Sequence, residues 1–350
     1  MPACRTFPLP PSRSSEKLTR LWQARALQTW LLWPIGACFQ LLSTLRRSAY
    51  RAGLLRSERL PVPVIVVGNI VAGGAGKTPL TLWLAQRLRA SGRCPGIVSR
   101  GYGRTDSVVR IVGAGETAGD VDAVAAVGDE PLLLARRSGC PVVVGSDRVA
   151  AGRALLAAHP DCDMILCDDG LQHYRLHRDV EIAVIDRRGL MNGWPLPAGP
   201  LREPAARLHT VDAVVLHDST LQLPLSVPTF HMRLHGKHFY RLDAPDIRTT
   251  PGELARLRLH AIAGIGEPQR FFDHLSALGL AFEVHAFPDH YRYTESDLQL
   301  VGDAILTTEK DALKCTGLTT LPIWVLPVDA VIEPDLAAFI LERINGPAPA

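Results

Sequence analysis

The sequence predicts an α/β fold, in which a mostly parallel β-sheet is covered by helices on both faces. Short apolar runs alternate with helix-like segments along most of the 350 residues, which is typical of parallel sheets. The first of these runs, at residues 62–67, leads into a cluster of glycines that opens a helix. A chain of this length favours two domains, and near residues 219–228 the composition shifts to short polar segments punctuated by proline.

We therefore expect four segments along the chain. Residues 1–20 form a disordered start, and residues 21–56 form a membrane-associated N-terminal helix. Residues 57–222 form the larger domain, which contains the glycine cluster, and residues 223–350 form a smaller α/β domain that contributes His290.

Charge and cysteine content exclude several classes of protein. The 38 Lys and Arg residues nearly balance the 35 Asp and Glu residues, so no dedicated nucleic-acid surface is expected. The seven cysteines are scattered and form no C-x-x-C pair, so neither a disulfide framework nor a zinc knuckle is implied. Several of them lie in apolar runs, which favours buried thiols in a reducing compartment.

An apolar stretch near the N-terminus predicts a helix at a membrane surface. No charged residue occurs from Ala26 to Leu45, but two glutamines, a proline and a glycine make this stretch a weak membrane span. Its two tryptophans favour the interface, and Arg46, Arg47 and Arg51 follow directly, where they would meet anionic headgroups. Two other interpretations stay open: a secretory signal, for which no clean cleavage site follows, and a helix packed on the domain core.

The glycine cluster has the layout of a phosphate-binding loop, which makes the expected fold P-loop NTPase-like. The loop consists of Gly73, Gly74, Ala75, Gly76, Lys77 and Thr78. Glycines let backbone N–H groups converge on an anion, Lys77 can reach the outer phosphates of a nucleotide, and the Thr78 hydroxyl can bind Mg²⁺. Pro79 suits the first helical turn, whereas Val71 stands where the regular motif has glycine.

A second strong signal is the pair Asp168 and Asp169, which ends the apolar run at residues 164–167. Mg²⁺ bound to a nucleotide requires a carboxylate, directly or through water. Because ligands of parallel sheets bind at the carboxyl ends of strands, we expect this pair close to the phosphate-binding loop.

Weaker signals follow other apolar runs. Arg100 and Tyr102 lie in a glycine-rich turn that suits phosphate, although a solvated turn would look similar. Asp129 and Glu130 open a helix, where acidic residues are ordinary capping chemistry but can also act as a base or bind Mg²⁺. His290 lies between an aspartate and a tyrosine, and it is either a structural hydrogen-bonding group or an assistant to a catalytic carboxylate.

The other elements are assigned from apolar runs and helical spacing. In the larger domain the expected strands are residues 62–67, 96–99, 142–144, 164–167, 182–185 and 213–216, and the expected helices are residues 78–90, 130–137 and 148–158. The second half repeats the alternation at residues 259–263, 269–278, 282–286, 294–301, 304–306, 323–325 and 334–344.

Together the motifs resemble one family, the tetraacyldisaccharide 4'-kinases of lipid A biosynthesis. The likeness rests on residues 68–79, Ser99–Gly103, Gly128–Pro131, Asp168–His173, Leu201–Glu203 and Asp289–Tyr291. It implies a P-loop kinase associated with the Gram-negative inner membrane, peripheral or monotopic, with its active site on the cytoplasmic side. It also implies transfer of the γ-phosphate of ATP, with Mg²⁺, to the 4'-hydroxyl of tetraacyldisaccharide 1-phosphate, without an obligate protein partner.

The resemblance further implies roles for single residues. Lys77 and Thr78 would hold the phosphates and Mg²⁺, with Glu130 and Asp168 as further metal ligands. The nucleotide-binding residues would be Gly73, Gly74, Ala75, Gly76, Lys77 and Thr78.

On the acceptor side, the resemblance makes Asp129 the base for the sugar hydroxyl, assisted by His290, with Asp169 close to both. The site or the lipid headgroup pocket would be lined by Arg100, Tyr102, Arg202 and Glu203.

Two other classes fit parts of this pattern. The deviant-Walker ATPases share the compact glycine cluster but carry an extra lysine where this chain has Ala72. A soluble small-molecule kinase or ligase of the same fold is disfavoured by the apolar stretch. The chain also departs from the family pattern at Val71, where a threonine is usual, and at Leu171, where a phenylalanine is usual.

Overall fold

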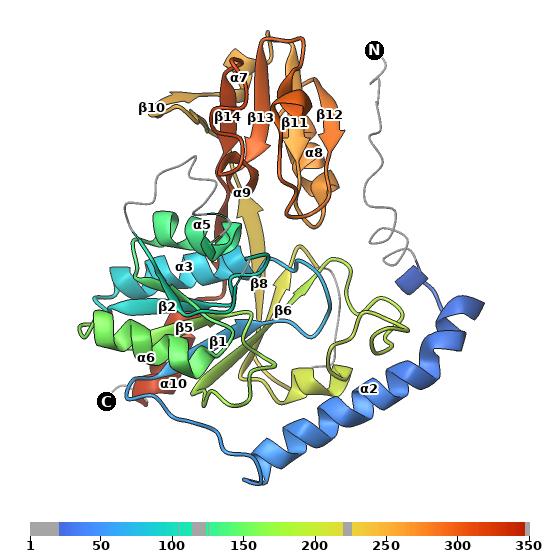
Figure 1. Ribbon diagram of the computed structural model, residues 1–350, viewed down its shortest axis with the longest axis vertical. Helices are drawn as coiled ribbons and strands as arrows, with labels where there is room; N and C mark the ends of the chain where they lie inside the picture. Colours follow the sequence, from blue (N-terminus) through green and yellow to red (C-terminus); the bar gives the residue numbers. More distant parts are fainter. Residues whose placement is uncertain (1–20, 105, 114–123, 125, 220–225, 347–350) are drawn as a thin grey trace.

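The computed structural model describes residues 21–104, 106–113, 124, 126–219 and 226–346. These residues form two β-sheets, one in each half of the molecule, with a long helix lying along the outside of the larger half (Figure 1). The disordered start that the sequence predicts at residues 1–20 lies outside these ranges.

The larger sheet has nine strands in the order β15-β8-β7-β6-β1-β5-β2-β4-β3. Its strands are β1 (Val64–Gly68), β2 (Pro95–Ser99), β3 (Arg110–Val112), β4 (Val142–Val144), β5 (Met164–Asp168), β6 (Val180–Asp186), β7 (Ala213–His217), β8 (Thr229–His235) and β15 (Asp329–Glu333). All pairs are parallel except the two outermost, β3 with β4 and β15 with β8. The predicted mostly parallel sheet is therefore confirmed.

Helices cover both faces of this sheet, as the continuous apolar strands require. Successive residues of β1 face opposite cores: Ile65 and Val67 pack with α3 (Lys77–Ala90), α5 (Asp129–Ser138) and α10 (Leu336–Asn345), whereas Val64 and Val66 pack with α6 (Arg148–Ala158). Every residue of β1 is buried. Burial on both sides explains why these strands read as unbroken apolar runs rather than as alternating patterns.

The smaller sheet has six strands in the order β10-β9-β14-β13-β11-β12. Its elements are β9 (Phe239–Arg241), β10 (Ala244–Thr249), α7 (Pro251–Leu254), β11 (Leu259–Ala263), α8 (Pro268–Ala277), β12 (Phe282–Ala286), β13 (Ala304–Thr308), α9 (Glu309–Ala312) and β14 (Ile323–Leu326). Of the region predicted at residues 294–301, only a 3-10 turn at Glu295–Leu298 is regular. This sheet has its own apolar cores on its two faces.

The chain crosses between the two sheets twice, which differs from the division predicted at residues 222 and 223. Strand β8 still belongs to the larger sheet, where it pairs with β7. After the smaller sheet is complete, β15 returns to pair with β8, and α10 packs on the core of the larger sheet. The last part of the chain therefore completes the larger half, and the two halves are joined by two strands.

Helix α2 (Leu27–Arg51) lies against the larger half with one face and leaves the other uncovered (Figure 1). On the packed face, a Cβ placed on Gly36 would lie 3.0 Å from the carbonyl oxygen of Pro195, and the rings of Trp30 and Trp194 are 4.7 Å apart. The uncovered face exposes Leu31, Ile35, Leu42 and Leu45. Within the described ranges, no helix is long and apolar enough to cross a membrane.

Candidate active site

The phosphate-binding loop joins β1 to α3 and depends on glycine at one position above all. Gly76 caps α3 with φ of 91°, a left-handed conformation that favours glycine. A Cβ on Gly76 would also lie 2.3 Å from Nδ1 of His217, which is closer than any real contact. Val71, the departure from the regular motif, is buried and pairs with Leu201.

His217, at the end of β7, contacts the backbone of the loop. The sequence alone did not identify this residue. Its Nδ1 lies 3.0 Å from the carbonyl oxygen of Ala75, and its Nε2 lies 2.8 Å from Nη2 of Arg270 on α8. Because a guanidinium only donates, Nε2 accepts and Nδ1 carries the proton that it donates to Ala75. Burial and the charge of Arg270 lower the pKa of His217, which agrees with a neutral ring.

Arg188 is a second unpredicted residue at the loop. Its Nη2 donates to the carbonyl oxygen of Gly74 at 2.7 Å, and its Nε donates to Asp186 at 2.8 Å. No motif marks this arginine in the sequence, because its place depends on where β6 ends relative to the loop. It adds a guanidinium to the site where Lys77 points.

Asp169 gathers two cations at the end of β5. Its Oδ1 lies 3.7 Å from Nζ of Lys77 and 3.3 Å from Nη1 of Arg202. Burial alone would raise the pKa of Asp169, but the charges of Lys77 and Arg202 hold it below its usual value. The residue has φ of 48°, an uncommon conformation outside glycine that turns its side chain toward the loop.

Asp168 is almost completely buried beside the loop. Its Oδ1 accepts a hydrogen bond from Thr81 at 3.1 Å, and its Oδ2 lies 3.5 Å from Oγ of Ser99. Burial, followed by the negative charges of Glu130 and Asp169, raises the pKa of Asp168 to about 7. A buried carboxylate crowded by like charges is a place where a divalent cation would be strongly stabilised.

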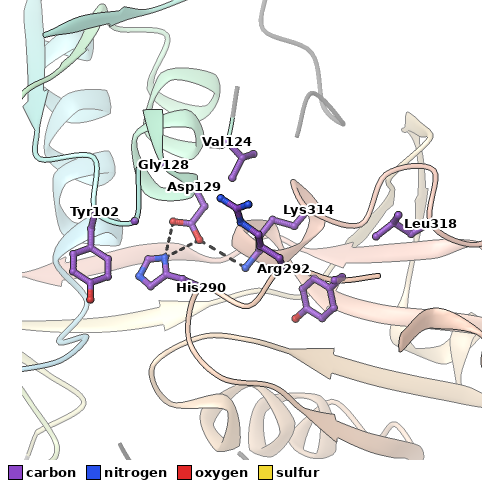
Figure 2. A pocket seen from close by; sticks show the side chains of 10 residues that line it. Tyr102, Val124, Gly128, Asp129, His290, Arg292, Lys314 and Leu318 are labelled. Atoms are coloured by element: carbon purple, nitrogen blue, oxygen red, sulfur yellow. Dashed lines mark hydrogen bonds and ion pairs between the residues drawn. The ribbon is translucent and has the colours of Figure 1, made fainter. Parts of the chain in front are cut away.

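The smaller half contributes His290 to the start of α5 in the larger half. Its Nδ1 lies 3.0 Å from each carboxylate oxygen of Asp129, and Nζ of Lys314 lies 3.7 Å from Asp129 (Figure 2). These residues line a cavity of about 90 Å³ that also includes Tyr102. The two sheets therefore meet at a histidine–carboxylate pair.

Electrostatics make this pair strongly ionic. Burial alone would raise the pKa of Asp129, but the hydrogen bond from His290 and the charges of Lys310, His290 and Lys314 lower it to about 2. For His290, burial works to lower the pKa, but the hydrogen bond to Asp129 and the negative charges nearby raise it above its usual value.

Lys310 at the start of α9 is a further unpredicted member of the site. Its Nζ lies 2.9 Å from Asp289, 3.4 Å from Glu130 and 3.4 Å from Nε2 of His290. Burial opposes its charge, yet Glu130, Asp129 and Asp289 raise its pKa. In the sequence, the one sign of a role for Lys310 is that residues 307–311 directly follow an apolar run that predicts a strand.

The predicted acceptor-side residues fall into different environments. Tyr102 is 62% exposed, with its ring 4.9 Å from that of His290, and Arg100 is exposed just after β2. Glu203 is instead buried, and its oxygens accept from Tyr174 at 2.6 Å and from Gln172 at 2.9 Å. Glu203 therefore holds other side chains in place rather than facing the cavity.

The two halves of the site lie close together. A Cβ placed on Gly266, in the loop after β11, would lie 3.7 Å from the backbone nitrogen of Gly74. Lys310 reaches across from the smaller half to Glu130, which neighbours Asp129 and whose charge acts on Asp168. A phosphate held by the loop and a hydroxyl beside His290 would therefore share one site.

Comparison with known proteins agrees with this arrangement. A family model described as tetraacyldisaccharide-1-P 4'-kinase (LpxK) matches residues 28–345. The tetraacyldisaccharide 4'-kinase of Dechloromonas aromatica is 52% identical over 336 residues, which cover 94% of this chain and 97% of the relative. The enzyme of the same name from Neisseria meningitidis is 46% identical over 335 residues, which cover 94% and 95%.

A solved structure of LpxK from Aquifex aeolicus in complex with ATP matches with a TM-score of 0.77 and 29% identity, covering 91% of this chain and all of that one. The matches span the phosphate-binding loop, the carboxylates and the smaller half, and they decide against the deviant-Walker ATPases and the soluble small-molecule kinases. The chain therefore belongs to the tetraacyldisaccharide-1-P 4'-kinase family, and it is a kinase of lipid A biosynthesis.

Proposed function

We propose that this chain transfers the γ-phosphoryl group of ATP to the 4'-hydroxyl of tetraacyldisaccharide 1-phosphate where its two sheets meet. One observation carries the proposal. Asp129 of the larger half and His290 of the smaller half form a pair. This pair is linked through the carboxylate of Glu130 to Asp168, which lies beside the phosphate-binding loop. Phosphoryl transfer depends mainly on positioning and charge neutralisation, and such an arrangement supplies both.

The donor half of the site binds ATP. Backbone N–H groups of Gly73, Gly74, Ala75 and Gly76 converge on the phosphates, and the N-terminus of α3 adds its positive dipole. Lys77 neutralises the outer phosphates, and Arg188 adds a second cation. Asp169 keeps Lys77 in place through its carboxylate.

Mg²⁺ would be held by the Thr78 hydroxyl, Glu130 and Asp168, together with phosphate oxygens and water. The donor set fits, because Asp168 is buried among like charges and its pKa is raised to about 7. When bound, the ion neutralises charge on the phosphates. Thr81 fixes the orientation of Asp168 by its hydrogen bond.

The acceptor half uses Asp129 and His290 as a unit. Asp129 is 2% exposed and has a pKa of about 2, so it takes up a proton poorly near neutral pH. We therefore assign the proton of the 4'-hydroxyl to Nε2 of neutral His290, while Asp129 accepts from Nδ1–H and fixes the tautomer. The hydroxyl oxygen then bonds to phosphorus as the bond to ADP breaks. This assignment differs from the role that the family resemblance implies for Asp129, which is that of the base itself.

The acceptor lipid approaches from the membrane side. Arg100, Tyr102 and Arg202 line the open side of the site, with Glu203 as a positioning residue. The uncovered apolar face of α2 rests at the inner membrane as a peripheral contact, with the active site on the cytoplasmic side where ATP is available.

An assay with radiolabelled ATP and the acceptor lipid in detergent micelles tests this function. Label entering the lipid supports the proposal, whereas phosphate release without acceptor would support an ATPase switch. Lys77→Ala should reduce turnover by about a thousand-fold or more because the loop loses its cation. A near-normal rate in that variant would remove the loop from the mechanism.

A further inference from the structure

A second cavity, which is lined by none of the residues assigned to catalysis, lies between the C-terminal end of α2 and the larger half. Its volume is about 370 Å³, within the range of small-molecule sites. Helix α2 contributes Arg47 and Arg51 to its wall, and the larger half contributes Tyr174, Arg178 and Arg207. Nothing in the mechanism uses this cavity.

The cavity is strongly basic. Four arginines and one carboxylate, Glu181, line it. Glu181 is already engaged by Arg178 at 2.9 Å and by Arg207 at 2.5 Å, and both of these arginines therefore have a counter-ion. Glu203, which does not line the cavity, lies 3.2 Å from Arg207 and 4.0 Å from Arg47, so the four arginines are near two carboxylates and positive charge stays in excess.

Arg47 lacks the partners that a buried guanidinium needs. Its Nε and Nη1 atoms are buried and have no hydrogen-bond partner among the residues that the structure describes. The carboxylate of Glu203 lies 4.0 Å from Nη1, beyond hydrogen-bond distance, and its oxygens already accept from Tyr174 and Gln172. A buried donor without a partner destabilises the folded chain, and more so when it is charged, so an anion in the cavity would stabilise Arg47.

The cavity lies at the end of the helix that exposes apolar side chains. Leu41, Leu42 and Leu45 are 59%, 67% and 56% exposed, within two turns of Arg47. A helix whose apolar face enters a bilayer places its flanking arginines at the level of the lipid phosphates. The anion that reaches Arg47 is therefore expected to be part of a lipid.

We propose that this cavity binds the phosphate group of a membrane lipid, with Arg47 as its main ligand and Arg51 beside it. Glu203, whose carboxylate lies 4.0 Å from Arg47, directly follows Arg202, which pairs with Asp169 in the active site. A lipid held here is thus anchored next to the catalytic centre. The phosphate comes either from the acceptor, as its 1-phosphate, or from a neighbouring anionic phospholipid, and the first source rests on the proposed function.

Two neighbouring arginines of α2 give a matched test. Arg47→Gln removes the cavity ligand, whereas Arg46→Gln removes the same charge from an exposed position one residue away that does not line the cavity. In phosphatidylcholine vesicles that carry the acceptor, Arg47→Gln should raise the KM for the acceptor about ten-fold at unchanged KM for ATP. Arg46→Gln should change it by less than about two-fold.

Two further measurements distinguish the acceptor from a phospholipid as the source of the phosphate. If it belongs to the acceptor, an acceptor without the 1-phosphate should show the raised KM with the wild-type chain, and Arg47→Gln should add nothing. If it belongs to a phospholipid, Arg47→Gln should weaken binding to phosphatidylglycerol vesicles without acceptor about ten-fold more than Arg46→Gln does. Either result supports the cavity.

The proposal would be overturned if Arg46→Gln and Arg47→Gln had equal effects on the KM for the acceptor and on binding to phosphatidylglycerol vesicles. The loss of one positive charge from α2 would then explain both effects without the cavity. Arg51→Gln repeats the test at an exposed position, where the substitution should not disturb folding. It should change the same quantity in the same direction as Arg47→Gln. Vesicle binding needs no turnover. A wild-type chain that binds vesicles through Arg47 but phosphorylates no lipid would thus refute the proposed function while leaving the cavity intact.

Discussion

Asp129 is ionised although almost none of its side chain reaches solvent. Burial favours the neutral acid, but His290 donates to both oxygens, and Lys310 and Lys314 add two positive charges. These interactions outweigh the burial and bring the pKa to about 2. The same hydrogen bond raises the pKa of His290, so the proton is held on the ring rather than on the carboxylate.

This pair predicts the pH dependence of turnover. The His290 ring must be neutral to accept a proton, so kcat should rise with pH through the pKa of His290, which lies above its ordinary value of 6.5. Asp129→Asn removes a charge that raises the pKa of His290, so the rise of kcat with pH should occur at lower pH in this variant. It should also lower kcat about a hundred-fold, because the tautomer is no longer fixed.

The measurement is kcat against pH from 5 to 9 for the wild type and the variant. Asp289→Asn is the matched control, because it removes an equal charge 3.7 Å from Nε2 without touching Nδ1. It should lower kcat far less than Asp129→Asn. A wild-type profile that stays flat across this range would make Asp129, with its pKa of about 2, the base after all.

At the scale of elements, the sequence predicts the buried strands well because their signal is local. The runs at residues 142–144, 259–263 and 282–286 match β4, β11 and β12 residue for residue, and most others differ by one or two positions. Each of the strands at the centre of the larger sheet is covered on both faces. Continuous apolar sequence is then sufficient to find it.

Edge and connecting strands carry no such signal. In β8 and β15 buried and exposed residues alternate, and β10 is mostly exposed. Their pairing depends on strands far away in the sequence, as when Ala330 of β15 pairs with Leu234 of β8. Single polar residues such as His217 and Arg188 were missed for the same reason, since only the folded chain brings them to the loop.

Helix α2 shows how one element can have two contrasting faces. Leu31, Ile35, Leu42 and Leu45 are exposed at spacings that place them on one side, while Gly36 packs tightly on the other. Full burial of one leucine is worth about 1.5–3 kcal/mol. Such a stripe can therefore hold the chain at a bilayer surface without help from the packed face.

Charges on this stripe should release the chain from membranes. Leu31→Glu with Leu42→Glu places two carboxylates where the apolar face enters the bilayer, so binding to phosphatidylcholine vesicles should weaken about ten-fold or more. Both residues are mostly exposed, 72% and 67%, so the midpoint of thermal unfolding should hardly change. Co-sedimentation and a melting curve measure the two quantities.

Ile247→Glu provides the control for this double variant. Ile247 is 48% exposed on β10 of the smaller sheet, away from α2 in the sequence and in the fold (Figure 1). Its substitution replaces an exposed apolar side chain with a carboxylate and should leave vesicle binding unchanged. If the α2 double variant binds vesicles as the wild type does, the membrane contact lies elsewhere.

At the scale of the whole molecule, the smaller half is a working part of the site. It supplies His290 and Lys310 to the acceptor side, and ion pairs join it to the larger half at Arg187 with Glu267 and at Arg137 with Glu309. Because β8 and β15 connect the halves, the position of the smaller sheet is tied to the edge of the larger one. Catalysis therefore depends on contacts between the halves as well as on residues within each.

The contact from Arg270 to the phosphate-binding loop gives a test of this dependence. Arg270 lies on α8 of the smaller half, donates to Nε2 of His217, and thereby fixes the Nδ1–H that donates to Ala75 inside the loop. Arg270→Ala removes the donor that sets this tautomer, so the loop should lose order. The KM for ATP should rise about ten-fold, because the contact from Arg270 reaches the loop through His217.

Gln269→Ala is the control, because this neighbour on α8 donates to Asp273 on its own helix, and the variant should leave the KM for ATP unchanged. Arg270→Lys keeps a donor but not the fork geometry, so its KM should fall between those of the wild type and Arg270→Ala. Initial rates at varied ATP and saturating acceptor measure all three. If Arg270→Ala lowers kcat while the KM for ATP stays constant, Arg270 acts on the position of His290 through the domain contact, and the chain through His217 does not support the loop.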